Sequence, residues 1–125
     1  MRGQAFQPAQ RVELARALVV KPEILYMDEP FSALDALMNL RMRNELLRIL
    51  AEERHTVLLI THDVEEAVYL ADRVAVMSNR PGRIKTIVPI DLPRPRRYEM
   101  VATPEFQKLH RTVLDEIRSE SIAAA

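Results

Sequence analysis

Two short apolar runs with a long amphipathic stretch between them constrain the fold of this chain more than any other feature. The runs are ILYM at 24–27 and TVLLIT at 56–61. Runs of this kind are typical of strands that are covered on both faces in a parallel sheet. Residues 36–54 carry leucine, isoleucine and methionine at helical spacing, which predicts an amphipathic helix. A strand, a crossover helix and a second strand form a βαβ unit, so we predict an α/β fold.

The remaining periodic segments extend this fold. They are a helix beginning at Pro8, a short helix at 64–71, a third strand at 73–78, a strand at 83–90 and a final helix capped by Thr103. The Pro81-Gly82 pair suits a turn, so the third strand and 83–90 are predicted to form a hairpin. We therefore expect three largely parallel strands in one sheet, flanking helices, a C-terminal hairpin strand and a closing helix.

The segment DLPRPRRYEM at 91–100 divides the predicted core from the final helix. It is rich in proline and arginine and has no periodicity, so we interpret it as a linker whose arginines, Arg94, Arg96 and Arg97, are solvated. The predicted organisation is a core at 1–90 followed by a linker and helix at 91–125.

Composition excludes several classes of function. The 125 residues suffice for one domain, and 18 basic and 18 acidic side chains give a formal net charge of zero. No overall positive field attracts nucleic acid or an anionic membrane, so we expect no nucleic-acid partner. Cysteine is absent, which excludes a disulfide framework and a thiolate nucleophile. No apolar run approaches the length of a membrane span, so any membrane role requires a partner.

Two adjacent acids follow the first predicted strand. Asp28 and Glu29 leave the carboxyl end of the strand, where α/β sheets place their ligands. Asp28 is chemically adequate to hold Mg²⁺, which takes oxygen ligands and keeps several waters. Glu29 is suited to orient or deprotonate a water for attack on a phosphate. The alternative is a strand that simply ends in a helix-capping turn.

A histidine and a third acid lie near the same predicted edge. His62 follows the second strand, which ends on the same side as the first if the two are parallel. There it is suited to donate a hydrogen bond to charge developing on a terminal phosphate. Asp35 precedes the long helix and has two compatible interpretations, a helix N-cap and a ligand contact.

Five motifs in order resemble the C-terminal half of an ATP-binding cassette (ABC) transporter ATPase subunit. They are QRVELARAL (10–18), ILYMDEP (24–30), SALD (32–35), THD (61–63) and EAVYLADRVAVM (66–77). The resemblance implies that Asp28 ends the Walker B strand and supports Mg²⁺, that Glu29 is the catalytic glutamate and that His62 contacts the γ-phosphate. It also implies that ATP is contacted by Ser32, Asp35, Gln10 and Arg11. NRPGRI (79–84) and DLPRPR (91–96) resemble the importers of nitrate, sulfonate and taurine.

Two departures from the family pattern affect whether this chain can bind nucleotide by itself. Where the family has Leu-Ser-Gly-Gly before Gln10, this chain reads Gln-Ala-Phe-Gln at 4–7. The chain also has only two glycines and no Gly-Lys-Ser/Thr, so it cannot build a phosphate-binding P-loop. We therefore expect a fragment that binds Mg²⁺–ATP weakly or not at all and that self-associates through uncovered apolar strands.

Three functions of different classes fit these observations. The resemblance favours an importer ATPase subunit, cytoplasmic and held on the inner face of the membrane by a permease, with a second ATPase subunit as partner. A non-catalytic remnant that acts as an interaction module is the second. A DNA-repair ATPase is the third, and the absence of coiled-coil heptads and zinc cysteines argues against it.

Overall fold

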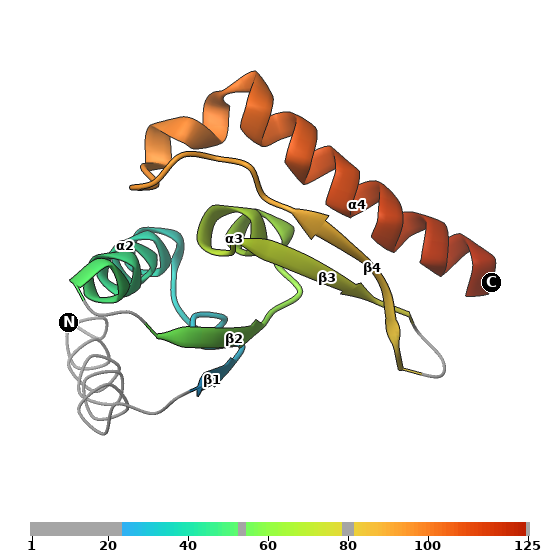
Figure 1. Ribbon diagram of the computed structural model, residues 1–125, viewed down its shortest axis with the longest axis horizontal. Coiled ribbons are helices and arrows are strands. Elements are labelled where there is room, and N and C mark those ends of the chain that lie inside the picture. Colours follow the sequence, from blue (N-terminus) through green and yellow to red (C-terminus); the bar gives the residue numbers. More distant parts are fainter. Residues whose placement is uncertain (1–23, 53–54, 79–81, 125) are drawn as a thin grey trace. The chain divides into compact units, whose positions relative to one another are not determined.

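The computed structural model describes residues 24–52, 55–78 and 82–124, with side chains as far as Ser119 (Figure 1). The elements in chain order are β1 (Ile24–Asp28), α2 (Ala36–Glu52), β2 (Thr56–Ile60), α3 (Val64–Leu70), β3 (Arg73–Met77), β4 (Ile84–Pro89), the 3₁₀ helix η1 (Tyr98–Ala102) and α4 (Pro104–Ala124). The helix predicted to begin at Pro8 lies outside the described residues. The chain divides into two compact units, Met1–Thr61 and His62–Ala125.

The first unit contains a parallel strand pair joined by α2. The register runs from Ile24 opposite Thr56 to Asp28 opposite Ile60, which confirms the predicted parallel pairing. The Glu29 amide extends the ladder by donating to the Ile60 carbonyl at 2.7 Å.

The prediction that both strands are covered on both faces is wrong for the described structure. Side chains of a pleated strand alternate between the two faces, and Leu25 is 5% exposed while its neighbours Ile24 and Tyr26 are 60% and 57% exposed. On β2, Leu58 and Ile60 are likewise exposed. An unbroken apolar run therefore gives one buried and one exposed set of side chains here.

The second unit places α4 against a hairpin. Strands β3 and β4 pair antiparallel, from Arg73 opposite Pro89 to Met77 opposite Ile84, with a register shift between Val76 and Met77. This confirms the predicted hairpin, and β3 pairs with β4 where a third parallel strand was predicted. Helix α4 contacts α3, β3, β4 and η1. The described residues thus form a mixed α/β fold with one parallel and one antiparallel strand pair.

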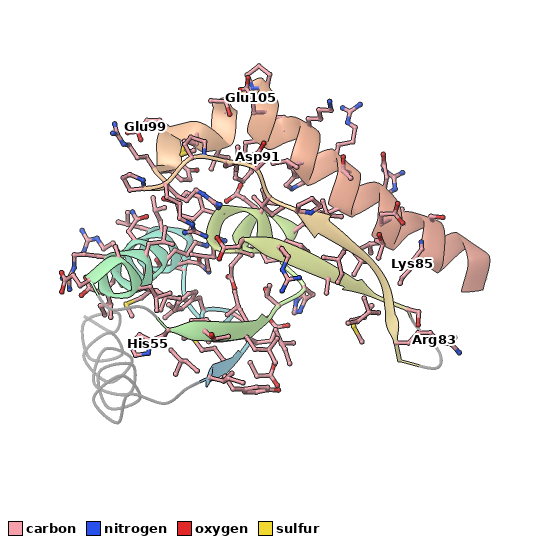
Figure 2. The ribbon with its side chains drawn as sticks, in the orientation of Figure 1. His55, Arg83, Lys85, Asp91, Glu99 and Glu105 are labelled. Carbon is pink, nitrogen blue, oxygen red and sulfur yellow. The ribbon has the colours of Figure 1, made fainter. Side chains whose placement is uncertain are left out.

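Buried side chains on α3, β3, β4 and α4 form the core of the hairpin unit. The members are Val68, Tyr69, Val76, Val88, Phe106 and Val113. The Thr103 hydroxyl accepts from the Phe106 amide at 3.3 Å, which confirms the predicted cap of α4. Figure 2 labels Lys85 on β4, whose ammonium group donates to the Glu116 carbonyl at 2.9 Å and so ties the hairpin to α4.

The prediction of a solvated Pro/Arg-rich linker is wrong for Arg96. Only 7% of this side chain is exposed, and its guanidinium donates to carbonyls of α3. The segment after β4 therefore packs against α3. One guanidinium can donate to several buried carbonyls at once, which is why an arginine is tolerated there. None of the described helices is long and apolar enough to cross a bilayer.

Candidate functional site

The carboxyl ends of β1 and β2 lie side by side, and Asp28 is the last residue of β1. Asp28 is the register partner of Ile60, and its side chain is exposed. A single exposed carboxylate at this edge fits Mg²⁺, which binds proteins through one or two carboxylates and keeps its other ligands from water and phosphate. Over 24–52, 55–78 and 82–124, no three acidic or histidine side chains are grouped closely enough to hold a metal by themselves. Asp28 would therefore act with ligands from a bound phosphate or water.

Glu29 turns the chain sharply at the end of β1. Its φ is 50°, in the left-handed region that residues with a Cβ rarely adopt. Holding a glutamate there costs of order 1–3 kcal/mol, and such residues cluster at functional sites. The Glu29 amide bond to the Ile60 carbonyl fixes the turn against the neighbouring strand.

Hydrogen bonds hold the loop from Glu29 to Asp35 in a compact form. The Ser32 hydroxyl donates to the Glu29 carbonyl at 3.2 Å. Phe31 is 2% exposed, and its carbonyl accepts from the Asn39 side-chain amide at 3.0 Å. The loop is thereby anchored at one end to β1 and at the other to α2.

Asp35 is the N-cap of α2. Its Oδ1 accepts from the Met38 amide at 2.9 Å, and its carbonyl accepts from the Asn39 amide at 2.8 Å. The capping interpretation of Asp35 is confirmed, and its contact with nucleotide stays a prediction.

His62 begins the second unit, directly after Thr61. Its side chain is exposed. Asp63 is the N-cap of α3 and accepts from the Glu66 amide at 3.2 Å, so His62 immediately precedes a capped helix. The sequence carries a signal for this cap, because an N-cap acid followed three residues later by a glutamate is a recognisable helix start.

Five of the seven predicted site residues lie in the described part of the chain. Asp28, Glu29, Ser32 and Asp35 lie on one continuous segment from the end of β1 to the start of α2. His62 belongs to the second unit. Gln10 and Arg11 lie outside the described residues. No local sequence signal indicates the hydrogen bonds that Arg94 and Arg96 donate to carbonyls of α3, because a run of charges is most often a solvated surface.

Comparison with known proteins shows what the chain resembles. No family model matches it. An ATP-binding protein of Brucella abortus is 54% identical over 104 residues, 83% of this chain and 40% of the relative. The aliphatic sulfonates import ATP-binding protein SsuB of Bacillus licheniformis is 45% identical over 111 residues, 89% of this chain and 42% of the relative. The bicarbonate transport ATP-binding protein CmpD of Synechococcus elongatus is 47% identical over 108 residues, 85% of this chain and 39% of the relative. The chain therefore spans about 40% of the length of the curated relatives that it matches.

Proposed function

From homology over most of its length to ABC transporter ATP-binding proteins, at 45–54% identity, we propose that this chain forms the C-terminal part of the ATP-hydrolysing subunit of an ABC importer. The observation that carries the proposal is the paired end of β1 and β2, with Asp28 and Glu29 leaving it. The sulfonate import and bicarbonate transport proteins among the relatives support nitrate, sulfonate, taurine or a similar small solute as the substrate of transport.

The site residues have complementary roles in this proposal. Bound Mg²⁺–ATP supplies the electrophilic γ-phosphate. Asp28 supports the cation, and the Glu29 carboxylate orients a water and accepts its proton during attack on phosphorus. His62 donates a hydrogen bond to the γ-phosphate as negative charge develops there. Ser32, Asp35, Gln10 and Arg11 are proposed to contact ATP.

ATP binding by these 125 residues alone is proposed to be weak. No Gly-Lys-Ser/Thr is present to surround the phosphates. Each missing charge-assisted hydrogen bond removes about 1.5–3 kcal/mol. A loss of about 6 kcal/mol converts a micromolar site into one of tens of millimolar. Titration calorimetry at millimolar ATP should then show no saturable heat.

The proposed partners follow from the same assignment. A transmembrane permease would hold the subunit on the cytoplasmic face of the membrane, and a second ATPase subunit would complete the pair. One observation favours the second candidate function, a self-associating module: Ile24, Tyr26, Leu58 and Ile60 expose apolar surface on β1 and β2.

A chimera tests the proposed function. The 111 matched residues of this chain replace their counterparts in the Bacillus licheniformis sulfonate protein, and ATP hydrolysis is measured after purification. We expect hydrolysis that falls by about a hundredfold or more in Glu29→Gln, because the base is lost. Glu105→Gln, at an exposed position on α4, is the matched control. A folded chimera that binds ATP and does not hydrolyse it would contradict the proposal.

A further inference from the structure

Helix α3 is too short to be stable without help from other parts of the fold. It comprises seven residues, Val64–Leu70, and isolated helices shorter than about 12–15 residues are marginal in water. The Asp63 side chain caps its N-terminal end. The stability of α3 therefore depends on the packing of Val68 and Tyr69 in the core and on the hydrogen bonds that close its C-terminal end.

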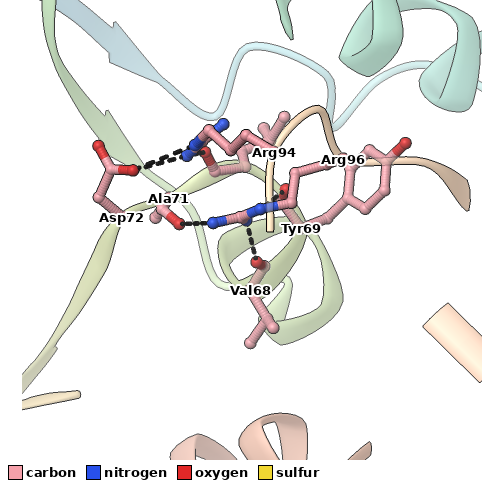
Figure 3. A network of polar contacts seen from close by, with 7 residues as sticks. Val68, Tyr69, Ala71, Asp72, Arg94 and Arg96 are labelled. Carbon is pink, nitrogen blue, oxygen red and sulfur yellow. Dashed lines mark hydrogen bonds and ion pairs between the residues drawn. The ribbon is translucent and has the colours of Figure 1, made fainter. Parts of the chain in front are cut away.

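Two arginines close the C-terminal end of α3. Of its last carbonyls, that of Ala67 accepts from the Ala71 amide at 3.0 Å. The carbonyls that follow have no partner within a helix. Guanidinium groups are their donors, as Figure 3 shows for Arg96. Arg96 donates to Val68 and Tyr69 at 3.1 Å each and to Ala71 at 3.2 Å. Arg94 donates to Leu70 at 3.0 Å. The positive charge of both arginines also stabilises α3, because the C-terminal end of a helix dipole is negative.

Arg96 is the central member of this cluster, which we call the arginine clamp (Arg94 and Arg96). It is 7% exposed, and its Nε is buried without a hydrogen-bond partner in the described part of the chain. Burying a cation is unfavourable unless it is hydrogen-bonded, so the carbonyl bonds are what hold it there. Arg94 is 41% exposed and forms an ion pair with Asp72 at 2.9 Å, so it braces the same helix end from the surface.

We propose that Arg96, supported by Arg94, is a positioning residue for His62: by fixing the C-terminal end of α3 it fixes the Asp63 cap and the histidine that precedes it. The inference rests on the proposed function only for the catalytic role of His62. The clamp itself rests on the hydrogen bonds of the structure.

Because α3 is short, a change at its C-terminal end affects its N-terminal end. Seven residues span about 10 Å, and α3 has few internal hydrogen bonds to keep its first turn when its last turn opens. Loss of Arg96 leaves three carbonyls without their donors. Fraying from that end removes the Ala71 bond to Ala67 and then the Ala67 bond to Asp63, which frees the residue next to His62.

The test uses NMR on the full 125-residue chain. Arg96→Gln removes the charge and replaces the guanidinium fork with a shorter side chain that carries a single amide group. Arg96→Lys keeps the charge without the two-pronged donor geometry, and Arg111→Gln makes the same charge change at an exposed position of α4. We expect amide hydrogen exchange at Glu66, Ala67 and Ala71 to rise at least about tenfold in Arg96→Gln. We expect the His62 ring signals to shift or broaden, with smaller changes in Arg96→Lys and none in Arg111→Gln. His55 and His110, the other two histidines, are internal references.

Each outcome decides the proposal. Faster exchange in α3 together with unchanged His62 signals would show a clamp that only stabilises the helix and would overturn the positioning role. Unchanged exchange would overturn the clamp. If Arg96→Gln does not fold, Arg94→Gln, which removes one carbonyl bond and the ion pair with Asp72, carries the same comparison.

Hydrolysis by the chimera separates this inference from the proposed function. If both hold, Arg96→Gln lowers kcat and leaves KM for ATP unchanged, because a misplaced His62 weakens contact with the transition state alone. If the chimera with Arg96 is inactive, the proposed function fails, and the NMR comparison still decides whether Arg96 positions His62.

Discussion

Replacing Asp35 separates the two roles that its position allows. Asp35→Ala removes the Oδ1 acceptor of the Met38 amide, which lies 2.9 Å away. Loss of an N-cap costs about 0.5–2 kcal/mol. Helix α2 has no acidic residue in its first turn, so the charge of Asp35 adds about 0.3–1 kcal/mol at low salt. We expect Asp35→Ala to lower the free energy of unfolding by about 1–2 kcal/mol.

Asp35→Asn is the matched variant, because asparagine caps a helix nearly as well and carries no charge. We expect it to lose only the dipole contribution, about 0.3–1 kcal/mol, and to lose less at high salt. Urea unfolding followed by circular dichroism measures both values, with Asp115→Ala on the exposed side of α4 as the control. Equal stability of Asp35→Ala and the unchanged chain would refute the capping argument. In the chimera, hydrolysis that survives in Asp35→Asn would limit Asp35 to capping, and a strong loss would support its contact with nucleotide.

Three further predictions concern Glu29, association and pH. Because the φ of Glu29 is 50°, Glu29→Gly should be more stable than Glu29→Ala by about 1 kcal/mol in urea unfolding, and equal stabilities would argue against the strained turn. Light scattering at low micromolar concentration should show a self-associated species with and without ATP, because exposed apolar strands promote association. A monomer would contradict that argument, and dimerisation only with ATP would show a nucleotide interface. Burial, followed by the nearby charge of Arg94, lowers the pKa of Arg96 to about 10, below its ordinary value. Arg96 is therefore a cation in both folded and unfolded chains below about pH 9. The stability difference between the unchanged chain and Arg96→Gln should therefore be constant from about pH 6 to 9, and the Arg96 contribution should rise with pH above about 10, where the unfolded chain binds more protons. If the stability difference between the unchanged chain and Arg96→Gln changed between about pH 6 and 8, the predicted pH dependence would be wrong.

Local signals in the sequence were sufficient to predict much of the fold. The helical spacing of apolar residues predicted α2. The caps at Asp35 and Thr103 were predicted because an N-cap depends on the residue itself and its next three neighbours. The parallel pairing of β1 and β2 followed from two apolar strands joined by one helix. These features depend on residues that are close in the sequence or on a connection rule with few exceptions.

Features that depend on distant contacts were missed. The burial of Arg96 depends on carbonyls more than twenty residues earlier in the chain, and no local pattern distinguishes a clamping arginine from a solvated one. Uncovered apolar strands were expected, but which side chains of β1 and β2 are exposed was not predicted, because an apolar run shows what a strand can bury and not what covers it. The left-handed Glu29 was also unpredicted, since glutamate has no preference for that conformation.

The arginine clamp also restricts how α3 can change in length. Each residue added to a helix turns its end by about 100° and advances it by about 1.5 Å. One insertion between Asp63 and Leu70 would therefore swing the carbonyls that Arg94 and Arg96 reach toward a different side of the helix. Substitutions in α3 leave this geometry in place, whereas insertions and deletions do not. Among related chains that keep both arginines, gaps in alignments should be absent from His62 to Asp72 and should collect outside that interval.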